Sequence, residues 1–144
     1  MVICADTSFL FSLYGHDSNT PRALAWVNAA GIPITITLLN GYELGNALRF
    51  AEFRKGIGVG EAALFWMDFD SDQSSGRLLL QVCNLVQVFE EARRLSVSRT
   101  LAGGHRGFDI LHVAAALRLG ATWFLTFDGN QKKLAEAEGL AVPI

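Results

Sequence analysis

Short apolar segments alternate along the chain with longer segments in which apolar residues recur at every third or fourth position. The short segments predict β-strands, and the longer spacing predicts helices. The predicted strands are residues 2–5, 34–37, 77–82, 122–126 and 140–142. The predicted helices are residues 9–13, 21–30, 38–54, 60–69, 85–102, 107–120 and 129–138. Thr7 or Ser8 is expected to cap the first of these helices, and Pro21 suits the first position of the second.

Strands separated by helices are typical of βαβ units, which build a mainly parallel sheet covered by helices on both faces. The pattern therefore predicts an α/β fold, a three-layer α/β/α sandwich with about four to five strands. The 144 residues are expected to form a single domain, since this is close to the commonest domain size. A hydrophobic content of 51% with 18% charged residues indicates a compact globule rather than a disordered chain.

Targeting signals are not evident in the sequence. No apolar run approaches the ~18 residues of a membrane helix, and the N-terminus lacks the basic region of a signal peptide. Cys4 and Cys83 lie in apolar segments with no CxxC motif or Cys/His cluster around them, which favours buried thiols in a reducing compartment. We therefore expect a cytoplasmic protein without a membrane partner.

Four carboxylates stand out because each lies in an otherwise apolar, structure-forming segment. They are Asp6, Glu43, Asp109 and Asp128. Asp6 and Asp128 follow predicted strands, and the ends of parallel strands meet at one edge of the sheet. Glu43 and Asp109 lie near the starts of helices that can reach the same edge. Four acids at one place repel each other unless a cation neutralises them, and oxygen ligands suit Mg²⁺ or Mn²⁺ rather than Zn²⁺. The principal chemistry of such a site is phosphoryl transfer or phosphodiester hydrolysis.

The segments around these acids resemble the four signature segments of a PIN domain, most closely those of VapC-type toxin ribonucleases. They are residues 2–10 (VICADTSFL), 42–49 (YELGNALR), 109–116 (DILHVAAA) and 125–128 (LTFD). The resemblance spans nearly the whole chain, with the segments in the family's order. It implies a metal-dependent ribonuclease that uses Mg²⁺ or Mn²⁺ and leaves 5′-phosphate and 3′-hydroxyl ends. It also implies a cognate antitoxin and a homodimer as partners.

The resemblance implies the same acidic quartet, Asp6, Glu43, Asp109 and Asp128, as the metal-binding and catalytic residues. Ser8 matches the small hydroxyl residue of the first segment, and Asn46 matches the amide that follows the glutamate. Ser8 and Thr126 are expected to orient carboxylates through hydrogen bonds. The chain departs from the family pattern after Asp128, where Lys132 or Lys133 would have to supply the basic residue often found there.

Each acid also has a local interpretation. Asp6 could cap a helix, Glu43 could pair with Arg49 or Arg54, and Asp128 could be a turn residue. Asp109 could be a favourable acid at a helix start.

Three further groups of residues are expected to be structural. His112 is expected to be a satisfied core histidine outside the site. Trp26, Trp66 and Trp123, with the phenylalanines, are expected in the core or at a dimer face. The acids at positions 68, 70 and 72 are expected in a solvated turn, because Gln73 replaces the glycine of a calcium loop.

Basic residues gather in one short stretch although the net charge is −2. They are Arg93, Arg94, Arg99, His105 and Arg106. Arg99 and Arg106 could line an RNA path toward the acids, whereas surface ion pairing with Glu90 and Glu91 is the alternative. The alternative function is a non-catalytic PIN-like module that binds RNA or protein. Phosphatases of the haloacid-dehalogenase type are disfavoured because Ser8 occupies the position of their second aspartate.

Overall fold

The computed structural model describes residues 1–144, and its elements alternate between strands and helices as the sequence predicts. The strands are β1 (Ile3–Ala5), β2 (Ile34–Ile36), β3 (Leu78–Leu80) and β4 (Trp123–Leu125). The helices are α1 (Thr7–Tyr14), α2 (Thr20–Ala30), α3 (Leu38–Phe53), α4 (Glu61–Ser75), α5 (Leu85–Leu95), α6 (Leu101–Gly103), α7 (Gly107–Arg118) and α8 (Gly129–Ala137). A π-helical turn, Ser96–Thr100, joins α5 to α6.

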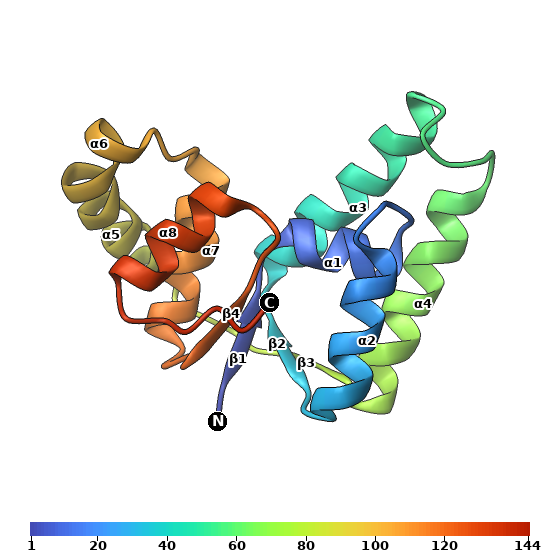
Figure 1. Ribbon diagram of the computed structural model, residues 1–144, viewed down its shortest axis with the longest axis horizontal. Coiled ribbons are helices and arrows are strands. Elements are labelled where there is room, and N and C mark those ends of the chain that lie inside the picture. The colour runs from blue at the N-terminus through green and yellow to red at the C-terminus, as the bar shows by residue number, and fades with distance from the viewer.

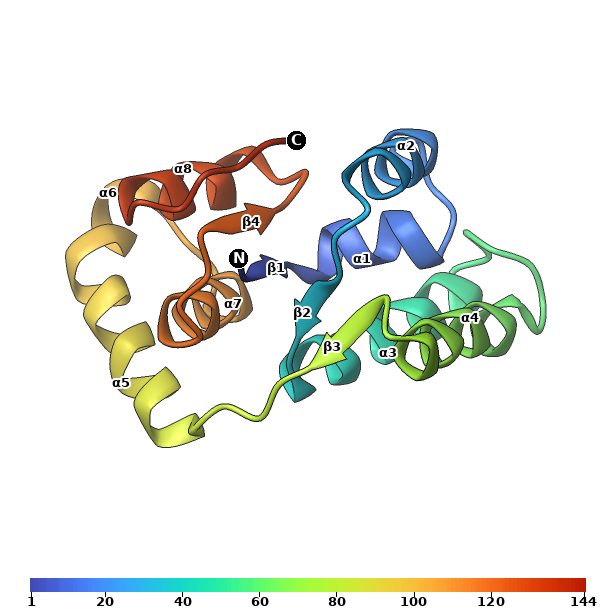
Figure 2. The same ribbon diagram turned by 90° about the horizontal axis from the view of Figure 1, so that it is seen from below.

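The four strands form one parallel sheet in the order β3-β2-β1-β4. Figures 1 and 2 show α1 to α4 on one side of this sheet and α5 to α8 on the other. Side chains alternate between the two faces along a strand, so Ile3 and Ala5 join one buried cluster and Cys4 joins the other. The α/β/α sandwich with a parallel sheet is confirmed, and both faces are covered because the strands are apolar on both sides.

The predicted fifth strand, residues 140–142, is reduced to a single bridge between Trp123 and Ala141. The helix predicted for residues 60–69 extends to Ser75, so the expected solvated turn at positions 68, 70 and 72 is wrong. Phe69 is 1% exposed and anchors this helix on the core. Asp72 accepts a hydrogen bond from the Tyr14 hydroxyl at 2.7 Å, which holds the last turns of α4 against α1.

Polar residues follow the carboxyl ends of three adjacent strands and begin the next helices. Asp6 follows β1 and caps α1, Thr37 follows β2 and precedes α3, and Asp128 follows β4 and caps α8. Asp6, not Thr7 or Ser8, is therefore the N-cap of the first helix. The Asp6 N–H donates to the Leu125 carbonyl at 3.0 Å, which brings the ends of β1 and β4 together. This edge of the sheet is where ligands bind in open parallel sheets.

None of the helices combines the length and the apolar character needed to cross a membrane.

Candidate active site

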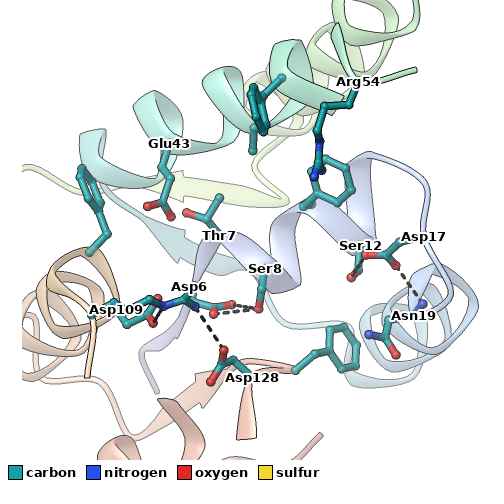
Figure 3. Close-up of a pocket in the computed structure, with 16 residues that line it drawn as sticks. Asp6, Thr7, Ser8, Ser12, Asp17, Asn19, Glu43, Arg54, Asp109 and Asp128 are labelled. Atoms are coloured by element: carbon teal, nitrogen blue, oxygen red, sulfur yellow. Dashed lines mark hydrogen bonds and ion pairs between the residues drawn. The ribbon is translucent and has the colours of Figure 1, made fainter. Parts of the chain in front are cut away.

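A pocket of about 810 Å³ opens at the carboxyl ends of β1 and β4, between α1, α3 and α7. All four acids singled out in the sequence line it, namely Asp6, Glu43, Asp109 and Asp128. Figure 3 shows them at one end of the pocket, with Asp17 and Arg54 toward the other end. The fold thus brings together four carboxylates that are spread over more than a hundred positions of the chain.

Asp6 is the most buried of these acids, at 3% exposure. Its Oδ1 accepts the Phe9 N–H at 2.8 Å, and its Oδ2 accepts the Thr126 hydroxyl at 2.8 Å. The Ser8 hydroxyl lies 2.9 and 2.8 Å from the two carboxylate oxygens. Burial raises the pKa of Asp6 to about 6 despite these hydrogen bonds, which favour the anion. A nearby cation would remove this cost of burying the anion.

Thr126 and Gln131 connect Asp6 to the other acids on its side of the pocket. The Asp128 N–H donates to the Thr126 hydroxyl at 3.0 Å, and the Gln131 N–H donates to Asp128 Oδ1 at 2.8 Å. The Gln131 amide also donates to the Asp109 carbonyl at 3.1 Å. Gln131 is almost completely buried and did not stand out in the sequence, although its position three residues after Asp128 is the spacing of a helix-capping contact.

Arg106 lies between Asp109 and Asp128. Its Nε is 3.0 Å from Asp109 Oδ2, and its Nη2 is 3.4 Å from Asp128 Oδ2. The hydrogen bond and charge of Asp109 raise the pKa of the guanidinium. Because 76% of the Arg106 side chain is exposed, this bridge is worth little in stability and can yield to another cation.

Glu43 faces the other acids from α3, and its Oε1 lies 3.0 Å from His112 Nε2. Burial acts to raise the pKa of Glu43, but hydrogen bonds from His112 and Thr7 outweigh it, so the pKa lies below its ordinary value. His112 is buried and satisfied as expected, and it also contacts one of the four acids. Neither Arg49 nor Arg54 pairs with Glu43.

Several residues proposed from the sequence lie outside this pocket. Arg99 pairs with Glu138 at 2.8 Å on the surface between the π-helical turn and α8. Asn46 is exposed and is not among the residues that line the pocket. Lys132 lies 4.0 Å from Glu136 on its own helix, and Lys133 does not line the pocket either. Of the two arginines predicted to line an RNA path, only Arg106 lies at the acids.

Phe50 of α3 and Arg54, which directly follows the end of α3, also line the pocket, although the sequence did not mark either of them as a site residue. Arg54 lies with its guanidinium 4.8 Å from the centre of the Phe50 ring, and both line the pocket. No carboxylate lies within salt-bridge distance of Arg54. The sequence did contain a signal for them, because the spacing of positions 43, 47, 50 and 54 places Phe50 and Arg54 on the same helix face as Glu43. The pocket thus has an acidic end and an opposite end where the guanidinium of Arg54 has no carboxylate partner.

The donor atoms at the acidic end suit a hard divalent cation, because all of them are carboxylate oxygens. As the side chains stand, no three of them have the compact arrangement that ligates one ion directly. Mg²⁺ keeps several waters and is commonly held by one or two carboxylates. The residues therefore fit a hydrated ion held directly by some of the acids and through water by others.

Comparison with known proteins identifies the family. Residues 3–137 match the PIN domain, so the chain belongs to the PIN domain family, whose members are generally nucleases. Similar solved structures include PAE2754 from Pyrobaculum aerophilum, with 21% identity, a TM-score of 0.60 and coverage of 96% of this chain and 86% of that one. FitAcB from Neisseria gonorrhoeae has 15% identity, a TM-score of 0.62 and coverage of 98% and 96%. At these identities the two structures establish the shared fold. No curated protein matches the chain.

Proposed function

We propose that this protein is a Mg²⁺- or Mn²⁺-dependent endoribonuclease that hydrolyses phosphodiester bonds in RNA. The observation that carries the proposal is the convergence of Asp6, Glu43, Asp109 and Asp128 at one end of a single pocket in a PIN fold. A scaffold without a cation would gain nothing from this arrangement, because four carboxylates in one pocket repel each other and burying Asp6 is costly.

The acids would hold the metal with unequal roles. Asp6 is fixed by three donors, so it is best prepared as a direct ligand. Asp109 and Asp128 each keep an oxygen that now faces Arg106, and these oxygens would turn to the ion. Bound Mg²⁺ or Mn²⁺ polarises the phosphate and makes water a stronger nucleophile at neutral pH.

Glu43 would complete the site from the opposite side and help to position the attacking water. Its low pKa keeps the carboxylate ionised at neutral pH, so it can accept a hydrogen bond from water. Arg106 would contact the RNA phosphate once the acids bind the metal. No side chain of the pocket is needed as a nucleophile. The expected products have 5′-phosphate and 3′-hydroxyl ends, as in the family that the sequence resembles.

The biological role that we propose is the toxin of a toxin–antitoxin pair. It rests on the resemblance of the four signature segments to VapC-type toxins. The same resemblance supports a cognate antitoxin, a homodimer and a cytoplasmic location, with the whole chain acting as one nuclease domain. Growth arrest on expression, relieved by co-expression of the product of the neighbouring reading frame, would support this role.

The proposed activity is tested with single-stranded RNA, Mg²⁺ or Mn²⁺, and the variant Asp6→Asn. We expect cleavage by the wild type that stops with EDTA and is abolished by the substitution while the circular dichroism spectrum is retained. Asp70→Asn is the matched control, because it makes the same charge change at an exposed position of α4. Cleavage by Asp6→Asn, or cleavage that survives EDTA, would overturn the assignment. RNA binding without cleavage in the wild type would favour the non-catalytic module.

A further inference from the structure

The two ring nitrogens of His112 face different kinds of group. Nδ1 lies 3.4 Å from the amide nitrogen of Asn40. Nε2 lies 3.0 Å from Glu43 Oε1 and 3.2 Å from the Thr7 hydroxyl oxygen. The imidazole is buried at 3% exposure, so these neighbours, rather than water, determine which nitrogen carries hydrogen.

The orientation of the Asn40 amide is fixed by two backbone groups. Asn40 Oδ1 accepts the Thr37 N–H at 2.9 Å, and Asn40 Nδ2 donates to the Ala5 carbonyl at 3.0 Å. Exchanging the oxygen and nitrogen of this amide would place two donors together at Thr37 and two acceptors together at Ala5. Asn40 is 3% exposed, so water cannot relieve either conflict. The amide nitrogen therefore faces His112.

It follows that Nδ1 of His112 is the acceptor. A hydrogen on Nδ1, as in the other neutral tautomer or in the imidazolium ion, would point at a second donor. The neutral ring then carries its hydrogen on Nε2, where an anionic oxygen of Glu43 lies within hydrogen-bond distance. Both hydrogens of the Asn40 amide are used, one on Ala5 and one on His112.

We propose that Asn40 fixes the Nε2–H tautomer of His112 and that His112 thereby positions the Glu43 carboxylate, acting as a positioning residue rather than as a metal ligand or general base. The Nε2 lone pair is not available in this tautomer, and the Nδ1 lone pair faces Asn40. One oxygen of Glu43 is held by the imidazole, so the carboxylate can present its other oxygen to the pocket.

The fold explains why these residues meet. Asn40 and Glu43 are three positions apart on α3, hence on neighbouring turns of one face. His112 reaches them from α7 and Thr7 from α1, so the arrangement joins the three helices around the pocket. Asn40 Oδ1 also accepts a hydrogen bond from the Thr37 N–H just before α3. Asn40 therefore stabilises the start of this helix and sets the tautomer of His112.

The tautomer is tested directly by ¹⁵N NMR of histidine side chains in the metal-free protein at neutral pH. His16→Gln and His105→Gln assign the signals, because His16 is exposed, His105 is partly exposed, and neither contacts Asn40, His112 or Glu43. We expect His112 as the Nε2–H tautomer, with Nδ1 resonating as an unprotonated nitrogen that accepts a weak hydrogen bond. The Nδ1–H tautomer or an imidazolium would overturn the proposal. This measurement is independent of nuclease activity.

The role of Asn40 is tested with Asn40→Ala in the same experiment. The substitution removes the donor to Nδ1, so we expect a mixture of the two tautomers in a protein that remains folded. An unchanged Nε2–H tautomer in the folded variant would show that Asn40 does not set it. Asn130→Ala is the control, since Asn130 Nδ2 approaches Nδ1 of a partly exposed histidine, His105, at 3.3 Å in a comparable contact.

The effect on Glu43 is tested by Mn²⁺ binding, and this arm rests on the proposed metal site. Loss of a partner that orients a ligating side chain typically lowers metal affinity about 10–100-fold, so His112→Leu is expected to weaken Mn²⁺ binding by such a factor. His112→Gln, which retains a side-chain donor, is expected to restore part of it. An equal loss in both folded variants would overturn the positioning role. Absence of Mn²⁺ binding by the wild type would overturn the proposed metal site and leave the tautomer to be decided by NMR.

Discussion

The hydroxyl of Thr126 donates a hydrogen bond to Asp6 Oδ2 at 2.8 Å, across 120 positions of the sequence. This hydroxyl has one hydrogen and two acceptors in reach, since Gln131 Oε1 lies 3.0 Å away. An ionised carboxylate is the stronger acceptor, so the hydrogen goes to Asp6. The contact holds the ends of β1 and β4 together where the four acids meet.

Thr126→Val is expected to destabilise the protein by about 1–3 kcal/mol, because it keeps the side-chain shape but removes one donor to the buried Asp6 carboxylate and the acceptor of the Asp128 N–H. Thermal and urea unfolding of the metal-free protein measure this loss. Thr122→Val is the matched control, since its exposed hydroxyl makes only a 3.4 Å contact with the Val2 carbonyl. Equal stability of the two variants would show that the hydrogen bond to Asp6 contributes nothing.

The raised pKa of Asp6 predicts how metal binding depends on pH. Between the ordinary value of 3.8 and about 6, folded metal-free protein retains a proton on Asp6 that the unfolded chain has released. For this group the stability of the metal-free protein therefore decreases as the pH rises from about 4 to about 6. A cation must displace the proton, so Mg²⁺ affinity should fall as the pH drops below about 6.

Calorimetric Mg²⁺ titrations of the wild type and of Asp70→Asn between about pH 5 and 8 measure this dependence. Both proteins are expected to lose affinity on the acid side, approaching about tenfold per pH unit for one displaced proton. An affinity that stays constant across this range would mean that Asp6 is already ionised throughout.

Arg106→Gln is expected to strengthen Mg²⁺ binding and weaken RNA binding. The guanidinium bridges Asp109 and Asp128, so it competes with a cation for their oxygens while adding positive charge at the pocket mouth. Its loss should also reduce the slope of log affinity for RNA against log salt concentration by about one. Calorimetry and RNA binding at several salt concentrations provide the measurement.

Arg99→Gln is the control for this substitution, because Arg99 pairs with Glu138 outside the pocket. It should leave both affinities near the wild-type values. Weaker Mg²⁺ binding by Arg106→Gln would contradict the proposed competition.

Arg54→Gln is expected to weaken RNA binding without affecting Mg²⁺ affinity. Arg54 lies at the end of the pocket away from the acids and has no carboxylate partner, so its charge is available to a phosphate. Fluorescence anisotropy with an uncleaved RNA in EDTA measures the loss. Arg49→Gln is the control, because Arg49 lies on α3 but lines a different pocket beside Trp66, so this variant should bind RNA as the wild type does. A parallel loss in both variants would indicate a general charge effect.

Local sequence was sufficient for the order and type of the elements, apart from the strand expected at residues 140–142. Apolar periodicity, Pro21 and the polar residues at strand ends are properties of neighbouring positions, so they specify where strands and helices lie. Boundaries were less accurate where packing decided them. The burial of Phe69 and the contact of Tyr14 with Asp72 carry α4 past its predicted end, and neither contact is visible from the residues around them.

In the candidate site, too, some features follow from local sequence and others from packing. The sequence by itself determined that four acids interrupt apolar segments. It also predicted that they meet at one edge of the sheet, because parallel strands end on the same side. Their local interpretations proved compatible with a shared pocket, since Asp6 and Asp128 cap helices with one oxygen and retain another for the pocket.

Only the tertiary structure decided which neighbours these acids have. It places Arg106 between Asp109 and Asp128 but directs Arg99 to Glu138, although both arginines come from one basic stretch. It also brings His112 to Glu43 from a different helix. The physical reason is that contacts between helices depend on how each helix is rotated and packed against the sheet, and this is set by the whole core rather than by adjacent residues.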